Sequence, residues 1–365
     1  MDPGFGYVFP AIRGIQAGRE YYVSMCPMRL LGKLFSYDEE EVRPEMRAQR
    51  TLNKARIPEI ARYMTKNDKG YVFSAITASV DGNLAFDPAD DSAEGRKIGS
   101  LHVSLDARFI INDGQHRRAA IKQALEDRPD LGDETIAVVL FVDRGLKRSQ
   151  QMFADLNRHA VRPSKSLGVL FDHRDEMAQT VRLAVLQSDF FRDIVELERS
   201  SLSKGSRKLL TLSALYSGSM ALLEGVEFKD AEEAVALTRE FWETIARNIP
   251  EWKMVQERSM ASGGVREDFI HSHGTVIHAL GIVGNSLLRK DPKAWKRPLS
   301  KIRSINWARS NHRLWEGRAM TGGRVQKARN NVTLTVNAIK RHIGIDLTPE
   351  EQRVEDAYVG MKNVG

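Results

Sequence analysis

The sequence predicts an α+β protein in which the strands come first and a helical part follows. Before residue 143, runs of β-branched and aromatic residues are separated by turns containing glycine and aspartate, a pattern typical of strands. We expect a mixed α/β domain over residues 1–163 and an all-helical domain over 164–365. In the second part, apolar residues recur at the spacing of amphipathic helices over 166–188, 207–224, 231–248, 268–289 and 324–343.

Local patterns place the individual elements. Pro58 suits the first turn of an amphipathic helix, and the triplet at 81–83 turns the chain after a strand. The runs at 101–105 and 109–111 form either a hairpin or two successive strands. We predict strands over 7–12, 20–25, 71–80, 101–105, 109–111 and 135–142. We predict helices within 43–56 (opened by Pro44), over 57–64 and over 147–159, and loops over 87–95, 200–206 and 259–264.

Bulk composition excludes several classes of protein. A chain of 365 residues with 42% hydrophobic and 28% charged residues is ordinary globular material. No apolar run approaches the roughly 20 residues of a membrane span, and the N-terminus lacks the pattern of a secretory signal. The single cysteine, Cys26, excludes an internal disulfide and a cysteine-rich metal site. We expect a cytoplasmic protein with no membrane partner.

The positive charge is concentrated in one segment. Residues 301–341 contain ten basic residues and one acidic residue, Glu316, and therefore carry +9. The whole chain carries +7, so the remaining residues together carry −2. Local basicity of this kind is what a nucleic-acid surface requires. Trp307 and Trp315 interleave with these arginines, and we expect both tryptophans in the core.

The most informative stretch is 109–121, which predicts a strand, a tight turn and a helix that starts at Gln115. His116, Arg117 and Arg118 then fall in the first helical turn, where a cation is electrostatically unfavourable by roughly 0.3–1 kcal/mol. Their presence favours an anion such as phosphate or a nucleotide in front of the turn. The alternative is that Asp113 caps the helix and pairs with Arg117, with His116 as polar surface.

The sequence Asp-Gly-Gln-His-Arg at 113–117 resembles the signature of DGQHR-domain proteins. Their fold is similar to the nucleotide-binding domain of the partition protein ParB and of sulfiredoxin, which we expect over 1–163. The chain is also similar, over essentially its whole length, to the B-protein family of bacterial DNA-phosphorothioation (Dnd) clusters. The segments that carry this resemblance are 7–14, 47–56, 153–158, 307–311 and 315–318.

Roles at the signature follow from residue chemistry. Arg117 and Arg118 suit phosphate charge, Gln115 and His116 can hydrogen-bond phosphate or an attacking water, and a glycine allows close backbone approach. Asp113 either helps to hold a metal ion or caps the helix, and capping is favoured. The candidate catalytic residues are Asp113, Gln115, His116 and Arg117.

The resemblance adds residues outside the signature. It places the helix end at Asn157 and Arg158 beside the nucleotide pocket, and Arg56 in a segment that covers the nucleotide. Alternatively, the helix end simply carries favourable cations and Ser164 caps the next helix. The candidate nucleotide-binding residues are Gly114, Arg117, Arg118, Asn157, Arg158 and Arg56. No Gly-Lys-Ser/Thr loop is present, so any ATPase activity is not of the P-loop kind.

The basic segment supplies the candidate DNA contacts, in which guanidinium groups bind phosphates and a few reach base edges. They are Arg303, Arg309, Arg313, Arg318, Arg324, Lys327 and Arg329. His271, His273 and His278 lack the spacing of a zinc site, and we predict no metal site.

The resemblance implies a DNA-binding repressor that autoregulates a phosphorothioation gene cluster. Its implied partners are promoter DNA of that cluster and ATP, alone or with Mg²⁺, with slow hydrolysis at the signature. A homodimer and contacts with other phosphorothioation proteins are further candidate interactions. The alternatives are a nucleotide hydrolase or DNA-nicking enzyme that acts directly on modified DNA, and a structural adaptor that binds neither nucleotide nor free DNA.

Overall fold

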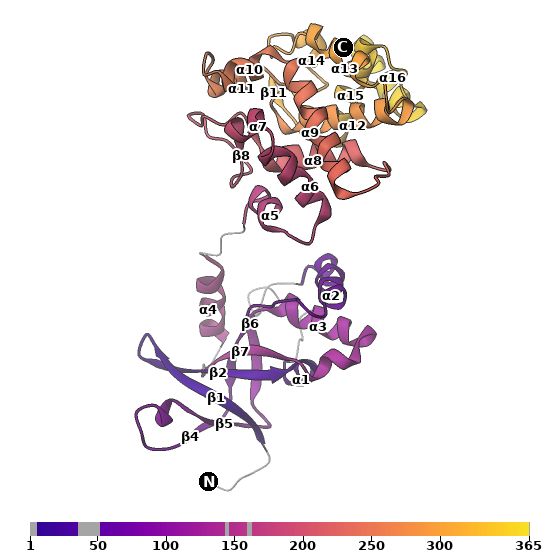
Figure 1. Cartoon of the computed structure of the whole chain (residues 1–365). Helices are drawn as coiled ribbons and strands as arrows, with labels where there is room; N and C mark the ends of the chain where they lie inside the picture. Colours follow the sequence, from indigo (N-terminus) through magenta and orange to yellow (C-terminus); the bar gives the residue numbers. More distant parts are fainter. Residues whose placement is uncertain (1–5, 36–51, 143–145, 159–162, 365) are drawn as a thin grey trace. The chain divides into compact units, whose positions relative to one another are not determined.

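The computed structural model describes residues 6–35, 52–142, 146–158 and 163–364. The chain forms two compact units, Met1–Val161 and Arg162–Gly365 (Figure 1). A seven-stranded sheet lies in the first unit and most of the helices lie in the second, so the α+β class is confirmed. The ParB-like fold of the first unit stays a prediction.

The sheet of the first unit has the strand order β4-β5-β1-β2-β7-β3-β6. Strands β3 and β7 pair in parallel, and the other neighbours pair antiparallel. Because β5 and β6 are not neighbours, the predicted hairpin is wrong and the alternative of two successive strands is correct. The strands are β1 (Gly6–Gln16), β2 (Arg19–Pro27), β3 (Ile76–Asp81), β4 (Leu84–Pro88), β5 (Ile98–Ser104), β6 (Arg108–Asp113) and β7 (Thr135–Val142).

Two local predictions need correction. The predicted strand over 71–80 starts only at Ile76, and the predicted loop over 87–95 includes the last two residues of β4, a strand that the sequence did not predict. Tyr71 and Phe73 precede β3 and pack on each other at a ring distance of 5.4 Å. These two aromatic residues therefore pack outside the sheet. Aromatic residues favour strands but also occur in packed segments beside a sheet, so the sequence pattern did not distinguish a strand from such a segment.

Helices α1, α2 and α3 of the first unit pack together, and α4 packs against β6 (Figure 1). In α3 the buried residues Ala120, Ile121 and Ala124 lie on one face, as their spacing predicts. The predicted helix opened by Pro44 falls outside the described residues. The helices are α1 (Met28–Leu34), η2 (Lys54–Arg56), α2 (Ile57–Lys66), η3 (Gly95–Lys97), α3 (Gln115–Asp127), η4 (Pro129–Asp133) and α4 (Leu146–Arg158).

The second unit is mainly helical but also contains two short sheets that the sequence did not predict. Strands β8 (Val195–Glu196) and β9 (Leu210–Thr211) form one, and β10 (Met320–Thr321) and β11 (Arg324–Val325) form the other. The helices are α5 (Lys165–Phe171), α6 (Glu176–Leu186), α7 (Asp189–Ile194), α8 (Leu212–Leu223), α9 (Ala231–Arg247), α10 (Pro250–Gln256), α11 (Ser262–Asp268), α12 (Gly274–Lys290), α13 (Lys296–Leu299), η5 (Ser300–Ser304), α14 (His312–Trp315), α15 (Arg329–Ile343) and α16 (Pro349–Val364).

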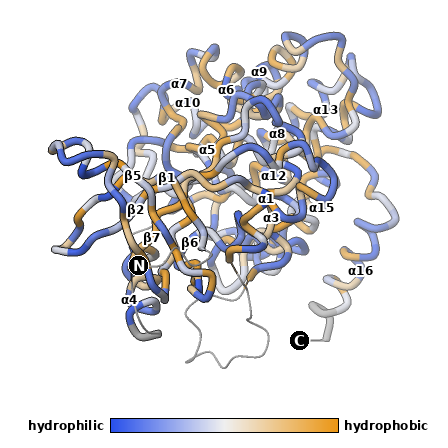
Figure 2. Tube along the Cα trace, turned by 90° about the horizontal axis from the view of Figure 1, so that it is seen from below, coloured by the Kyte–Doolittle hydropathy of each residue, from blue (hydrophilic) through white to orange (hydrophobic). Residues whose placement is uncertain are grey.

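The core of the second unit is organised around α8 and α12, which approach each other closely. A Cβ atom on Gly281 would lie 2.0 Å from the carbonyl oxygen of Gly218 on the facing helix. Only glycine permits this backbone contact. Trp252 and Trp315 are fully buried in the same core. Hydrophobic and hydrophilic stretches alternate along the helices (Figure 2).

Candidate functional site

The signature turn links β6 to α3 through Gly114, which has a φ of +108°. A Cβ atom at this position would lie 3.0 Å from both the Arg117 Nη2 atom and the Ile76 Cγ1 atom. The left-handed backbone and the tight surroundings both explain why glycine occupies the turn. Gln115 then begins α3 and is 5% exposed.

Asp113 does not cap α3, contrary to the favoured prediction. Gly114 is the N-cap residue, and the helix has no side-chain cap. The Asp113 carboxylate instead accepts a hydrogen bond from Arg117 Nη2 at 2.8 Å. This ion pair offsets part of the unfavourable interaction between Arg117 and the positive end of the helix dipole.

The two signature arginines also hold backbone carbonyls of neighbouring segments. Arg117 Nη2 donates to the carbonyl oxygen of Ala75 at 2.9 Å, just before β3. Arg118 Nη2 donates to the carbonyl oxygens of Phe35 at 2.7 Å and Gly32 at 3.3 Å, at the C-terminal end of α1. Both guanidinium groups therefore fix the elements around the turn, in addition to any role toward a ligand.

His116 connects the signature to η2. The backbone N–H of Asn53 donates to His116 Nε2 at 3.0 Å, so this nitrogen acts as an acceptor. The contact brings the N-terminal end of η2 to the first turn of α3. Arg56, the last residue of η2, is exposed. The rest of the predicted basic segment, 47–51, lies outside the described residues.

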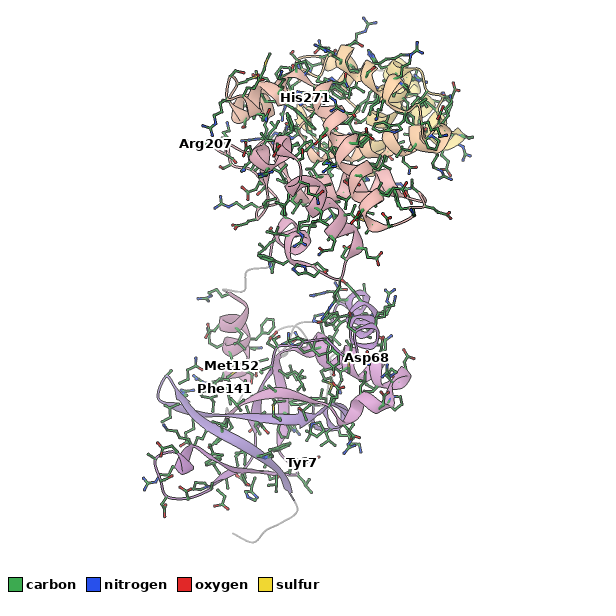
Figure 3. All side chains as sticks on the ribbon, viewed as in Figure 1. Tyr7, Asp68, Phe141, Met152, Arg207 and His271 are labelled. Atoms are coloured by element: carbon green, nitrogen blue, oxygen red, sulfur yellow. The ribbon has the colours of Figure 1, made fainter. Side chains whose placement is uncertain are left out.

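Helix α4 is joined to the strand that precedes the signature. Asn112 Nδ2 donates to the carbonyl oxygen of Ser149 at 3.1 Å, and Ser79 Oγ donates to Asn112 Oδ1 at 2.9 Å. Met152 extends from α4 in the same region (Figure 3), and its sulfur lies 3.9 Å from Ser79 Oγ. Arg158 ends α4 and is exposed, whereas the side chain of Asn157 lies outside the described part.

The predicted DNA-binding residues divide into two groups. Five of them have exposed side chains on separate elements of the second unit. Arg303 lies on η5, Arg313 on α14, Arg324 on β11 and Arg329 at the start of α15, and Lys327 precedes α15. The stacked indoles of Trp307 and Trp315, 5.3 Å apart, are buried, so their predicted core position is confirmed.

Arg318 and Arg309 differ from this exposed group. Arg318 donates to both oxygens of Glu355, at 2.6 and 2.8 Å, and lies over the Tyr358 ring at 4.4 Å. Glu355 is 0% exposed, and its guanidinium partner keeps the pKa of the carboxyl low against the opposing effect of burial. Arg309 Nη2 lies 2.7 Å from His273 Nε2, inside a cavity.

The C-terminal helix neutralises part of the basic segment. Lys340 is 2% exposed and donates to both oxygens of Glu351, at 2.7 and 2.9 Å. Arg341 pairs with Glu355 at 2.8 Å. The charge of +9 counted along residues 301–341 therefore overstates the positive charge at the surface, because the acidic partners come later in the chain.

The histidines of 271–278 belong mainly to the packing of the second unit. Trp252 Nε1 donates to His271 Nδ1 at 3.0 Å, and the imidazole is fully buried. Burial lowers the pKa of His273 to about 4 and also lowers the pKa of His278. Across the described residues, no three His, Cys, Asp or Glu side chains come together in a way that could hold a metal ion.

The cavity that contains Arg309 was not predicted as a site. It also contains Lys327, a second predicted DNA contact, and three cations that no predicted site included, Lys165, Lys204 and Arg266. These five side chains are scattered over more than 160 positions of the chain. Local motifs therefore give no signal for their assembly.

Comparison with known proteins identifies the family. The family model of DndB, described as DNA-sulfur modification-associated, matches residues 9–346. No curated protein and no solved structure matches the chain. Within the described residues, the helices are too short or too polar to cross a membrane. The match spans most of the sequence, and the chain belongs to the DndB family of DNA-sulfur modification-associated proteins.

Proposed function

We propose that this protein is a DNA-binding repressor of a DNA-phosphorothioation gene cluster and that ATP modulates its binding. The observation that carries the proposal is the set of exposed cations on the second unit. The set consists of Arg303, Arg313, Arg324, Lys327 and Arg329. Exposed guanidinium groups on separate elements suit contacts with successive backbone phosphates.

The packing around α15 separates two of these cations. Lys301 Nζ donates to the carbonyl oxygen of Ile343 at 3.3 Å, which places η5, and with it Arg303, near the C-terminal end of α15. Arg329 is the first residue of the same helix. A helix of this length extends about 20 Å, or roughly six base pairs of duplex at 3.4 Å per step. The spacing suits a duplex better than a single small anion.

A short hairpin presents a further cation. Gly322 and Gly323 turn the chain between β10 and β11 with φ angles of +59° and +72°. The Glu316 carboxylate accepts hydrogen bonds from the backbone N–H groups of both glycines. Arg324 follows this braced turn and is exposed. A rigid, exposed turn with an arginine suits contact with a groove or a phosphate.

The signature turn is the proposed ATP site. The start of α3 provides backbone N–H groups, and η2 and α4 are both joined to this region by hydrogen bonds. ATP, alone or with Mg²⁺, would change the arrangement of these elements and be slowly hydrolysed there. Such an effect on DNA binding requires that ATP has different affinities for the two arrangements.

The DNA part is tested by fluorescence anisotropy with a labelled promoter duplex of the protein's own cluster. The variant Arg303→Gln/Arg313→Gln/Arg324→Gln/Arg329→Gln should bind on the order of a hundredfold more weakly and flatten the salt dependence by roughly 0.9 per lost phosphate contact. The control carries Lys66→Gln/Lys69→Gln/Lys229→Gln/Lys290→Gln, which removes equal charge at other exposed positions. Equal affinities of the two variants would contradict the proposed surface.

The ATP part is tested by calorimetry and DNA titration in the same samples. Arg117→Ala should lose ATP binding, and its DNA affinity should no longer respond to ATP. Arg128→Ala is the matched control because Arg128 also pairs with carboxylates, Asp68 and Asp130, in the same unit. Melting temperatures of both variants separate ligand loss from unfolding. Unchanged ATP binding by Arg117→Ala would contradict the signature as the site.

A further inference from the structure

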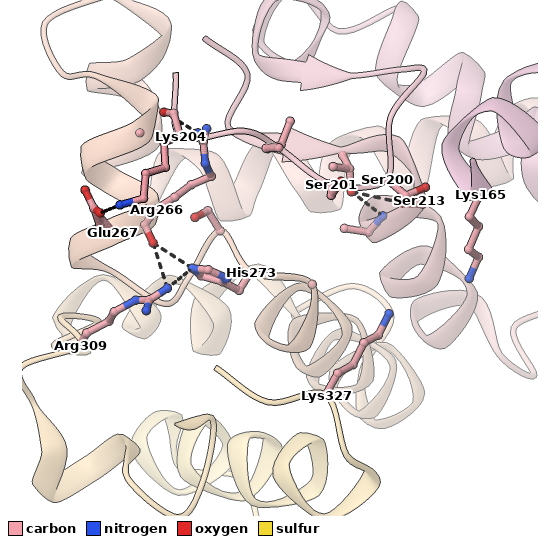
Figure 4. A pocket seen from close by; sticks show the side chains of 16 residues that line it. Lys165, Ser200, Ser201, Lys204, Ser213, Arg266, Glu267, His273, Arg309 and Lys327 are labelled. Carbon is pink, nitrogen blue, oxygen red and sulfur yellow. Dashed lines mark hydrogen bonds and ion pairs between the residues drawn. The ribbon is translucent and has the colours of Figure 1, made fainter. Parts of the chain in front are cut away.

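The second unit contains a cavity of about 610 Å³ that is lined mainly by polar and basic residues. In Figure 4, Lys204, Arg266 and Arg309 lie on one side, Lys165 and Lys327 on the other, and His273 between them. Glu267 is the single carboxylate among the described lining residues. The walls therefore carry a clear excess of positive charge.

The charge is unevenly compensated. Lys204 pairs with Glu267 at 2.9 Å, and Arg266 donates to backbone carbonyls of the adjoining loop, including those of Ser203 at 2.6 Å and Lys204 at 3.2 Å. Within the described part of the chain, Lys165 and Lys327 have no carboxylate partner within 4.0 Å. Lys165 Nζ donates to Ser217 Oγ at 3.1 Å and lies over the Tyr216 ring at 5.4 Å. Neither contact supplies a full negative charge, so an anion would be the missing counter-charge for both ammonium groups.

A helix terminus and a buried hydroxyl lie at the same cavity. Gly274 begins the 17-residue helix α12 and lines the cavity, so the positive end of the helix dipole faces this space. Ser272, two residues earlier, also lines it and is 7% exposed, and its Oγ has no hydrogen-bond partner among the described residues. A buried hydroxyl without a partner is energetically costly, and a bound acceptor oxygen would satisfy it.

The surrounding structure holds Lys327 in place. Thr275 Oγ, in the first turn of α12, donates to the carbonyl oxygen of Gln326 at 2.7 Å. Burial and the charge of Lys327 lower the pKa of Lys165. Burial, together with Lys327 and Lys165, also lowers the pKa of His278. The fold thus keeps like charges close to one another, and an anion between them would relieve the repulsion.

We propose that this cavity binds a small phosphate-containing anion. Lys165, Lys327 and Ser272 are the principal contacts to the phosphate groups. The volume lies within the range of about 300–1,000 Å³ found for small-molecule sites. No Phe, Tyr or Trp occurs among the described lining residues, and the His273 ring is held by Arg309 and the Arg266 carbonyl oxygen, so the polar contacts of the cavity favour phosphate over a base. The cavity belongs to the second unit and the signature turn to the first. Lys327 is also one of the proposed DNA contacts, so the test below changes Lys165 and Ser272 and leaves Lys327 intact.

The test uses the full chain and inorganic pyrophosphate as the probe, measured by isothermal titration calorimetry. Wild-type protein should bind pyrophosphate, and Lys165→Gln and Ser272→Ala should each weaken binding by about tenfold, since each removes one hydrogen bond to a charged ligand. Lys290→Gln, an exposed lysine at the far end of α12, should bind as wild type does. Melting temperatures verify that each variant is folded.

The outcomes separate the sources of phosphate. Absence of pyrophosphate binding to wild-type protein overturns the proposal, and so does equal binding by wild type and both variants. If Arg117→Ala loses pyrophosphate while Lys165→Gln retains it, the ligand occupies the signature turn and the proposal fails. If Lys165→Gln weakens the binding of duplex DNA but not that of pyrophosphate, the cavity contacts the DNA backbone and the small-anion assignment is wrong.

Discussion

At the scale of single residues, the structure assigns several conspicuous charged side chains to internal contacts. Asp113 pairs with Arg117 at 2.8 Å instead of capping a helix, and Arg318 pairs with a fully buried glutamate. The sequence predicted a helix cap for Asp113 and a DNA contact for Arg318. The partner decides its role, and only the folded chain supplies the partner.

The pair Arg318–Glu355 yields a stability prediction. Arg318→Ala would leave the Glu355 carboxylate buried without its bidentate partner, and loss of one member of a buried pair costs about 3–5 kcal/mol. We expect the free energy of unfolding to decrease by about 3 kcal/mol, the lower end of this range, because Arg341 and Asn337 still contact Glu355. Urea denaturation followed by tryptophan fluorescence measures it. Arg324→Ala should change stability little, and an equal loss in both variants would contradict the assignment.

His273 yields a prediction for pH dependence. Its folded-state pKa is lowered to about 4, mainly by burial, whereas an unfolded histidine titrates near 6.5. Between these values the unfolded state binds the proton and the folded state does not. Stability should therefore be complete above about pH 6.5 and fall as the pH decreases toward 4, by on the order of 3 kcal/mol.

The measurement is urea denaturation at pH 7 and pH 5 for wild type and His273→Asn. The variant should be less stable at pH 7, because the contact with Arg309 at 2.7 Å is altered. Its stability should nevertheless decrease less between the two pH values. An identical pH dependence in both proteins would show that other groups control the acid response.

At the scale of elements, glycine determines how closely α8 and α12 pack. Gly281→Ala would place a methyl group against the Gly218 carbonyl, and the helices must separate to accept it. Overpacking of this kind costs about 1–3 kcal/mol. Gly168→Ala on α5 is the control, since no atom lies within 4 Å of its added Cβ and alanine favours a helix by up to about 1 kcal/mol.

Thermal denaturation measures both glycine variants. The melting temperature should fall for Gly281→Ala and stay the same or rise for Gly168→Ala. If both variants melt as wild type does, then the α8–α12 contact accommodates a larger side chain and does not limit stability. Helix boundaries were predictable in outline, but this close approach depends on two residues 63 positions apart.

At the scale of the whole molecule, two separate cores give two independent reporters. All five tryptophans belong to the second unit, whereas the single cysteine, Cys26, is buried in the first. Burial raises the pKa of the Cys26 thiol to about 11, so it should react slowly until the first unit unfolds. Gly281→Ala should shift the urea midpoint seen by fluorescence and leave that of Cys26 labelling unchanged. Equal shifts of both midpoints would indicate that the units unfold together.

The sequence by itself determined the class of fold, most element positions of the first unit, the need for glycine in the signature turn and the core position of the tryptophans. These features depend on local propensity and on periodicity, which a single segment contains. Only the tertiary structure decided the strand order, the neutralisation of the basic segment by α16 and the cavity that joins Lys165, Ser272 and Lys327. Each of these depends on contacts between distant segments, and no local pattern specifies which distant side chains will meet.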